Sequence, residues 1–217
     1  MKCTSLLVAL LLLIHFACSS KVESIIENEP PPSPCEVLDF EYQNQMGCNG
    51  LIYSNPATTP YVIPFPPTTQ FSTGLTNCSQ SYHASGSPDQ YATDFDLPQG
   101  TVFTAARGGT VIKVKESANG PGGSGNYLHI DHGDNTFGLY YHSPENGIYV
   151  KEGDVVNQGT TLGEVGATGL VGYPHLHFIV VRGGTDYPYE GIPVSFANVI
   201  PADVVLESYT GYTACQY

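Results

Sequence analysis

The stretch PHLHFIVV, residues 174–181, indicates the fold most clearly, because it combines a strand pattern with two histidines. Its run of leucine, phenylalanine, isoleucine and valine predicts a buried β-strand. Side chains at positions i and i+2 of a strand point to the same face, so His175 and His177 are expected to lie side by side. Two neighbouring imidazoles indicate a zinc site when a carboxylate and another histidine are available nearby.

The rest of the chain predicts a mainly β fold built on an antiparallel sheet. Glycine (24 residues) and proline (17 residues) are frequent, and no long stretch has the 3.6-residue apolar period of a helix. Short runs of Val, Ile, Tyr and Phe between turn residues are typical of strands. The expected strands are residues 102–105, 109–115, 126–131, 137–141, 161–165 and 175–181, and residues 61–67 and 82–93 are expected to approach the core irregularly.

The first twenty residues, MKCTSLLVALLLLIHFACSS, predict a secretory signal peptide, because a basic start and an apolar run precede small residues. The apolar run is too short for a stable membrane span. We therefore expect a secreted protein, extracellular or periplasmic. Cys18 is also a candidate for lipid modification, which would make the protein an outer-surface lipoprotein with a lipid anchor.

The remaining residues divide into three segments. Residues 21–59 are acidic and Pro-rich at their start, which predicts a tether and N-terminal extension. Residues 60–182 are expected to form the main domain. Residues 183–217 are expected to form a C-terminal extension packed on that domain.

The cysteines predict disulfide bonds. Two of the six lie in the predicted signal peptide, and an even number, four, remains in an exported chain. Four cysteines allow three pairings, and the sequence does not choose among them. Cys35 with Cys48 is the most local option, whereas Cys78 with Cys215 would hold the C-terminus. The absence of any CxxC pair disfavours a cysteine zinc site.

The charge of the chain limits its partners. Twenty acidic residues against seven basic ones give a net charge of −13. Such a charge disfavours nucleic acid and anionic membrane surfaces as partners. Beyond the first twenty residues no stretch is apolar enough for a transmembrane span. We expect a monomer.

Several motifs accompany the histidine pair in a fixed order. They are His83, YATDFDLPQGT at residues 91–101, AARGGTV at residues 105–111, Tyr141-His142, GATG at residues 166–169 and HLHF at residues 175–178. This combination resembles the M23 zinc metallopeptidases, which are lysostaphin/LytM-type Gly-Gly or peptidoglycan endopeptidases. The resemblance covers roughly residues 60–182. It implies an antiparallel β-domain of the M23 peptidase (duplicated hybrid motif) type, with a substrate groove on one sheet.

The resemblance also implies a set of site residues. One zinc ion per chain would be bound by His83, Asp94 and His177, and His142 and His175 would flank the open position on the metal. Many family members place the first histidine closer to the aspartate. Here the nearest upstream histidine lies eleven residues before Asp94, a spacing similar to that of a subgroup of the family.

Each of these residues has an alternative interpretation. His177 could be a hydrogen-bonded core histidine, and His83, among Ser, Gly and Pro, could be a solvated loop residue. Asp94 could be a turn residue, with Asp96, two residues on and on the same face, as the alternative carboxylate. Two further histidines are not assigned to the site: His129 has no predicted role, and His132 is expected to be structural.

The residue types predict hydrolytic chemistry. Zinc held by imidazoles and a carboxylate keeps a position for water, and it lowers the pKa of that water from about 15.7 toward about 7. No HExxH motif supplies a glutamate base. His142 and His175 are therefore expected to transfer protons and to stabilise the oxyanion, in an order that the sequence does not decide.

These features predict a secreted zinc metalloendopeptidase that hydrolyses peptide bonds in peptidoglycan stem or cross-bridge peptides, or in other Gly/Ala-rich peptides. The alternative is a noncatalytic zinc-containing M23-like protein that binds or regulates. A third hypothesis, a metal-free structural or carbohydrate-binding β-domain, predicts that metal removal changes nothing.

Overall fold

The computed structural model describes residues 44–200 and 202–217. The predicted signal peptide (residues 1–20), Cys18 and Cys35 lie outside these residues. Within the described ranges, no helix has the length and hydropathy that crossing a membrane requires.

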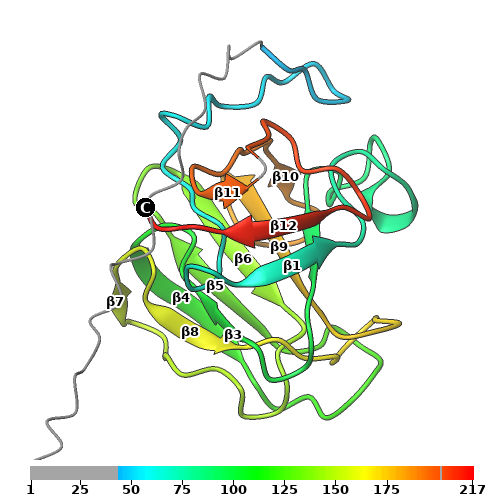
Figure 1. Ribbon diagram of the computed structural model, residues 1–217. Coiled ribbons are helices and arrows are strands. Elements are labelled where there is room, and N and C mark those ends of the chain that lie inside the picture. Colours follow the sequence, from blue (N-terminus) through cyan, green and yellow to red (C-terminus); the bar gives the residue numbers. More distant parts are fainter. Residues whose placement is uncertain (1–43, 201) are drawn as a thin grey trace, which may run out of the picture. The chain divides into compact units, whose positions relative to one another are not determined.

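The described residues form a ten-stranded sheet and a separate two-stranded sheet, and the strands pair antiparallel throughout (Figure 1). The large sheet has the order β11-β12-β1-β2-β9-β6-β5-β4-β7, with β10 added to β9, and β3 pairs with β8. The strands are β1 Gln70–Thr73, β2 Thr93–Asp96, β3 Val102–Thr104, β4 Gly109–Lys115, β5 Tyr127–Asp131, β6 Thr136–Tyr141, β7 Val155–Val156, β8 Thr161–Glu164, β9 His175–Arg182, β10 Glu190–Gly191, β11 Val199–Ile200 and β12 Gly211–Ala214. The prediction of a mainly β, antiparallel fold is confirmed.

All six strands expected from the sequence are present, as β3, β4, β5, β6, β8 and β9, and their ends differ from the expected ones by at most one residue. The sequence did not predict β1, β2, β7, β10, β11 and β12. These are short strands of two to four residues, and several of them contain Gly, Ser, Thr or Glu. Each of them pairs with another strand, either the next one along the chain, as β11 does with β12, or a distant one, as β1 does with β12.

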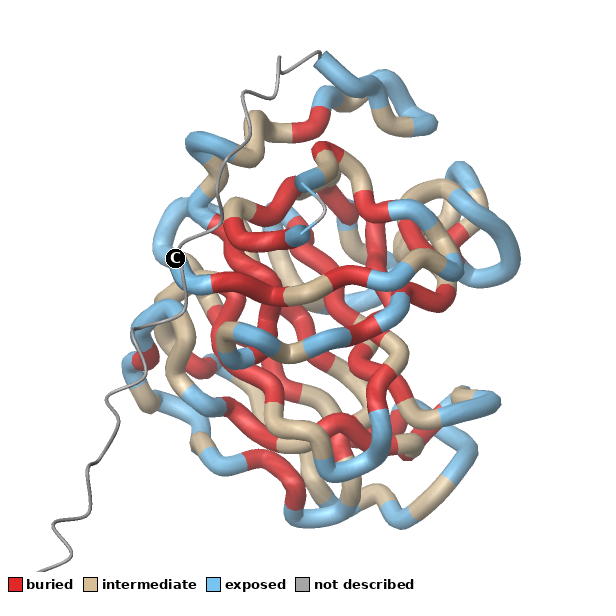
Figure 2. The backbone as a smooth tube through the Cα atoms, in the orientation of Figure 1, coloured by how far each residue is buried: buried red, intermediate tan, exposed pale blue. Residues whose placement is uncertain are grey.

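Strand β9 separates two environments, because its side chains alternate between the faces of the sheet. Leu176, Phe178 and Val180 join the main hydrophobic core. Ile179 and Val181 join a smaller apolar cluster on the opposite face. In Figure 2, most residues of the central strands are coloured as buried. His175 and His177 alternate in step with Ile179 and Val181, so they point to the same face as the smaller cluster and away from the main core.

The two-stranded sheet packs on the large one through stacked aromatic rings. Phe103 of β3 and Tyr140 of β6 are both buried, and their ring centroids are 5.7 Å apart with nearly parallel planes. The Tyr140 hydroxyl accepts a hydrogen bond from the Ala106 backbone N–H at 2.9 Å. This contact holds the loop after β3 against the central strands.

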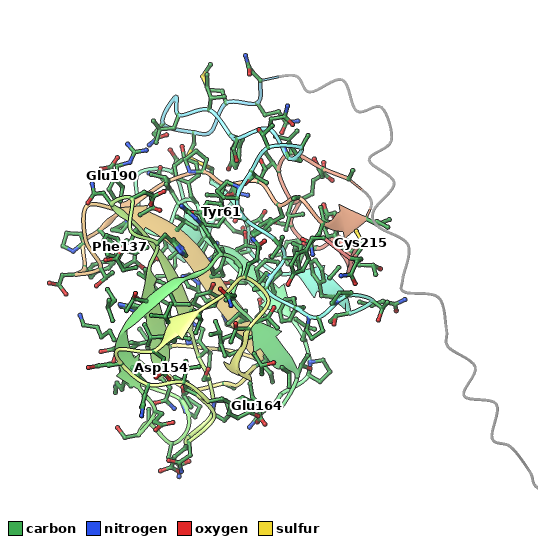
Figure 3. All side chains as sticks on the ribbon, turned by 90° about the vertical axis from the view of Figure 1, so that its left-hand side faces the viewer. Tyr61, Phe137, Asp154, Glu164, Glu190 and Cys215 are labelled. Carbon is green, nitrogen blue, oxygen red and sulfur yellow. A yellow bond between two sulfur atoms is a disulfide. The ribbon has the colours of Figure 1, made fainter. Side chains whose placement is uncertain are left out.

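The residues after Gly183 add strands to the same large sheet. Glu190, labelled in Figure 3, lies on β10 opposite Arg182 of β9, and β12 lies between β1 and β11. The C-terminal segment therefore extends the sheet on which the histidines lie.

A disulfide joins Cys48 to Cys78. The local option, Cys35 with Cys48, is therefore wrong, and so is the pairing of Cys78 with Cys215. Cys215, labelled in Figure 3 after β12, is also disulfide-bonded. Gly47 packs so closely against the Tyr91 ring that a side chain at position 47 would collide with it. Tyr91 lies in the same apolar cluster as Cys78, so the chain before Cys48 folds back toward Cys78. The sequence does not reveal this approach.

Candidate metal centre

Three central strands place a carboxylate, a histidine and a tyrosine in one row across the sheet. Asp94 on β2 lies opposite His177 on β9, and His177 lies opposite Tyr141 on β6. Directly opposite residues of antiparallel strands project to the same face. His175 lies two residues before His177 and projects to that face as well, as the sequence predicted.

His83 reaches this face from the connection between β1 and β2. It is the last residue of a short 3-10 helix, Ser81–His83, and only 1% of its surface is exposed. It is therefore not a solvated loop histidine. Its ring centroid lies 5.2 Å from that of His177. The eleven-residue spacing to Asp94 is thus compatible with close approach in space.

Three potential ligand atoms converge on one point. Asp94 Oδ1 lies 3.4 Å from His83 Nε2 and 2.9 Å from His177 Nδ1. Ligands of a tetrahedral zinc ion at about 2.1 Å would be about 3.4 Å from one another. Within the described part of the chain, His83, Asp94 and His177 form the group that could hold a metal ion, with ligand atoms within 4.8 Å of one another. Two imidazoles and one carboxylate are a donor set that suits zinc and leaves a fourth position for water.

The electrostatics of this group favour close pairing of opposite charges. Burial alone would raise the pKa of Asp94, but hydrogen bonds with His177 and His83 hold that pKa well below its usual range. Burial would lower the pKa of His177, but Asp89 and Asp94 on either side raise it to about 10. With this pKa, the His177 ring is protonated and positively charged near pH 7. A metal ion binds a deprotonated ring nitrogen, so it would displace the proton and supply the positive charge in its place.

The two flanking histidines are held in one tautomer by the backbone. Nδ1 of His142 lies 2.8 Å from the carbonyl oxygen of Thr168, and Nδ1 of His175 lies 3.0 Å from that of Tyr173. A carbonyl only accepts hydrogen bonds, so Nδ1 carries the proton in both rings and Nε2 keeps a free lone pair. The two ring centroids are 4.8 Å apart.

His142 also has an unusual backbone. It follows β6 with a φ angle of 79°, in the left-handed region that few non-glycine residues adopt. Burial, reinforced by His177 and His175, lowers the pKa of His142 to about 3, and burial also lowers the pKa of His175. Both rings are therefore neutral near pH 7.

A cleft of about 900 Å³ opens over these groups. Its walls are rich in tyrosine, and Lys113 lies in it next to Asp186, with Nζ 3.0 Å from Oδ1. The tyrosines that line it are Tyr82, Tyr127, Tyr141, Tyr173, Tyr187, Tyr189 and Tyr209. The cleft gives an extended molecule access to the candidate metal centre.

The other candidate residues lie outside the ligand group. Asp96 is half-buried beside the Tyr173 hydroxyl, and burial raises the pKa of its carboxyl to about 6. His129 Nε2 lies 3.2 Å from the Tyr141 hydroxyl. His132 Nδ1 donates to the Gly108 carbonyl oxygen at 2.9 Å, outside the residues that line the cleft.

Sequence reasoning did not identify Asp89. Its Oδ1 lies 3.5 Å from His177 Nε2, on the opposite side of the ring from Asp94. Burial would raise the pKa of Asp89, but the nearby His177 ring and the hydrogen bond from Tyr189 lower it. Asp89 lies in a turn five residues before Asp94, and no periodic pattern in the sequence marks it.

Part of this chain is similar to known peptidases. Residues 89–188 match the model of Peptidase family M23. Peptidoglycan DD-endopeptidase ShyA of Vibrio cholerae is 39% identical over 92 residues, which are 42% of this chain and 20% of the relative. Peptidoglycan DD-endopeptidase ShyC of the same organism is 38% identical over 86 residues, 40% of this chain and 18% of the relative.

Among solved structures, a zinc containing peptidase from Vibrio cholerae matches with a TM-score of 0.45 and 26% sequence identity, over 64% of this chain and 43% of the other. The aligned part of this chain spans about a fifth of the length of the curated relatives. The similarity to peptidase family M23 is carried by residues 89–188, which are less than half of the chain. The matched segment includes Asp94, His142, His175 and His177, and it begins after His83.

Proposed function

We propose that this protein is a secreted zinc metalloendopeptidase that hydrolyses peptide bonds in peptidoglycan stem or cross-bridge peptides. His83, Asp94 and His177 bind one zinc ion, and His142 and His175 are the catalytic histidines. The observation that supports this most strongly is the convergence of three ligand atoms on one point beside two histidines of fixed tautomer.

The proposed mechanism divides the work between metal and protein. When bound, zinc supplies a water of lowered pKa and polarises the scissile carbonyl. His142 and His175 are neutral and carry their proton on Nδ1, so either can accept a proton at Nε2. The imidazolium formed in this way can donate to the leaving amine, and its charge can stabilise the oxyanion.

The substrate class is inferred from the family and from the cleft. Two relatives are peptidoglycan DD-endopeptidases by name, which makes peptidoglycan peptides the first substrates to test. The cleft has a volume of about 900 Å³, and seven tyrosines are among the residues that line it. We further propose that residues 60–182 form the catalytic domain and that the protein acts as an extracellular or periplasmic monomer.

The test combines metal content with hydrolysis of purified peptidoglycan and pentaglycine. We expect the wild type to hold about one zinc per chain, His177→Ala to lose it, and His175→Ala to keep zinc but to lose cleavage. Zinc binding without cleavage of either substrate would favour a noncatalytic M23-like binding protein. A wild-type protein that binds no zinc would rule out the metallopeptidase.

A further inference from the structure

His177 lies between two carboxylates, one at each ring nitrogen. Nδ1 lies 2.9 Å from Asp94 Oδ1, and Nε2 lies 3.5 Å from Asp89 Oδ1. The second distance is within ion-pair range and longer than a well-formed hydrogen bond. The side chains of His177 and Asp89 are only 12% and 18% exposed, so little water competes for either group.

The two nitrogens of His177 have different neighbours and therefore different tasks. Nδ1 and His83 Nε2 both point at Asp94 Oδ1, which makes Nδ1 the ligand atom of the candidate metal centre. Nε2 then carries the proton and faces Asp89. A metal-bound histidine that donates its other N–H to a carboxylate is held in one tautomer and orientation and is a more basic ligand.

Asp89 is itself held in place from the C-terminal side of the chain. The Tyr189 hydroxyl donates a hydrogen bond to Asp89 Oδ1. Tyr189 directly precedes β10, which pairs with β9 at Val181 and Arg182. Its ring packs against the small apolar cluster beside the site, which contains Ala92, Leu139, Ile179 and Val181.

The turn that carries Asp89 is also closely packed against the segment that carries Tyr189. A Cβ on Gly191 of β10 would lie 2.8 Å from the backbone oxygen of Pro88, the residue before Asp89. The segment that carries Tyr189 therefore lies directly against the turn that carries Asp89. Tyr189 lies one residue beyond the segment matched by the family model, and Asp89 is its first residue.

We propose that Asp89 is a positioning residue that orients His177 for the metal, and that Tyr189 supports it by holding the Asp89 carboxylate. This inference rests on the proposed zinc site, and it assigns a role to a residue of the C-terminal extension. Neither Asp89 nor Tyr189 touches the metal in this arrangement, so both act through His177.

The test measures zinc affinity by competition with a chromophoric chelator at pH 7, using the full chain. We expect Asp89→Ala to weaken zinc binding about 10- to 100-fold, as for other carboxylates behind a metal-bound histidine. Asp89→Asn keeps an oxygen that can accept the Nε2 proton, so it should recover part of the affinity. Tyr189→Phe should weaken binding less than Asp89→Ala does.

A double variant distinguishes support through Asp89 from a general packing effect. If Tyr189 acts through Asp89, Asp89→Ala combined with Tyr189→Phe should bind zinc as weakly as Asp89→Ala alone. Asp186→Asn is the matched control, because Asp186 lines the same cleft and pairs with Lys113 rather than with His177. Its zinc affinity should equal that of the wild type.

Two results would overturn the inference. One is an Asp89→Ala protein that binds zinc as tightly as the wild type, and the other is a loss from Tyr189→Phe that simply adds to the loss from Asp89→Ala. Because the readout is zinc affinity, a wild type that binds zinc but cleaves no peptide contradicts the proposed activity and leaves the Asp89 test intact. A wild type without zinc affinity contradicts both.

Discussion

Asp94 and His177 face each other across the pairing of β2 with β9, and Asp94 Oδ1 lies 2.9 Å from His177 Nδ1. They are 83 residues apart in the chain. The register of β2 and β9 brings them together. If β9 slipped by one residue, the side chain of His177 would point toward the main core instead. The candidate metal centre is therefore a property of the sheet, to which the 3-10 helix adds His83.

The first prediction concerns Asp94 and its neighbour. Asp94→Ala removes the carboxylate at the point where the ligand atoms converge, so zinc binding should be lost. In the wild type, a metal present at about 100 times its dissociation constant stabilises the fold by about 2.7 kcal/mol. Chelation should therefore lower the melting temperature of the wild type and leave that of Asp94→Ala unchanged. Calorimetry with and without EDTA measures both.

Asp96→Asn is the matched control for this experiment. Asp96 lies beside the Tyr173 hydroxyl, outside the group of converging ligand atoms. Its zinc-dependent change in melting temperature should remain. Loss of that change in Asp96→Asn, with retention in Asp94→Ala, would assign the ligand to Asp96 instead.

The second prediction separates chemistry from metal binding. His142→Ala should keep zinc, because His142 is not among the three converging residues. It should lower kcat for peptide hydrolysis by about 10²- to 10⁴-fold, the usual contribution of a general acid or base. Zinc content and steady-state kinetics on the same preparation give both quantities.

His132→Gln is a suitable control for His142→Ala. Glutamine can still donate to the Gly108 carbonyl, and His132 does not line the cleft. Hydrolysis by this variant should match the wild type. Equal losses in the two variants would show that histidine replacement acts through the fold rather than through catalysis.

The third prediction tests the close approach behind His142. A Cβ on Gly166 would lie 2.4 Å from the backbone nitrogen of Pro144 and 2.5 Å from the carbonyl oxygen of His142. Gly166→Ala should therefore destabilise the fold by about 1–3 kcal/mol, as overpacking does, and should reduce activity by displacing His142. Urea unfolding and a peptidase assay measure the two effects.

Gly211→Ala provides the comparison for Gly166→Ala. Gly211 also lies in extended structure, but a Cβ there meets no atom within 4 Å and its φ is not positive. The free energy of unfolding should change little in this variant. A Gly166→Ala protein as stable as Gly211→Ala would contradict the close approach.

The fourth prediction concerns acid stability. Burial, reinforced by Lys113, lowers the pKa of His129 to about 4, below its usual value of 6.5, although Asp186 opposes this shift. The unfolded chain therefore binds a proton at His129 more readily than the folded chain. The resulting contribution to stability is complete above about pH 6.5 and is lost as the pH falls toward 4, on the order of 3 kcal/mol in all.

His129→Gln should remove this part of the pH dependence. Urea unfolding in the presence of a chelator, at several values between pH 4 and 7, gives the free energy of unfolding for both proteins. The difference between wild type and variant should shrink as the pH falls. A difference that is constant across this range would show that His129 has the same pKa in the folded and unfolded states.

The sequence by itself determined the strands that alternate strongly and the side of β9 on which the histidines lie. A period of two residues places His175 and His177 on one face and Leu176 and Phe178 on the other, whatever the partner strands are. The six predicted strands include the longest ones, β4, β5, β6 and β9, which are rich in apolar, β-branched and aromatic residues. The order of the motifs also indicated the family. The residue types within each motif can be read directly from the sequence.

Only the tertiary structure decided which distant groups meet. The pairing of Cys48 with Cys78, the approach of His83 to Asp94, and the position of Asp89 behind His177 all depend on how loops fold back. Short strands such as β10 and β12 show little apolar alternation in their sequences. Their strand conformation depends on hydrogen bonds to β9 and to β1. Contacts between residues far apart in the chain arise from packing and register, which a local pattern does not encode.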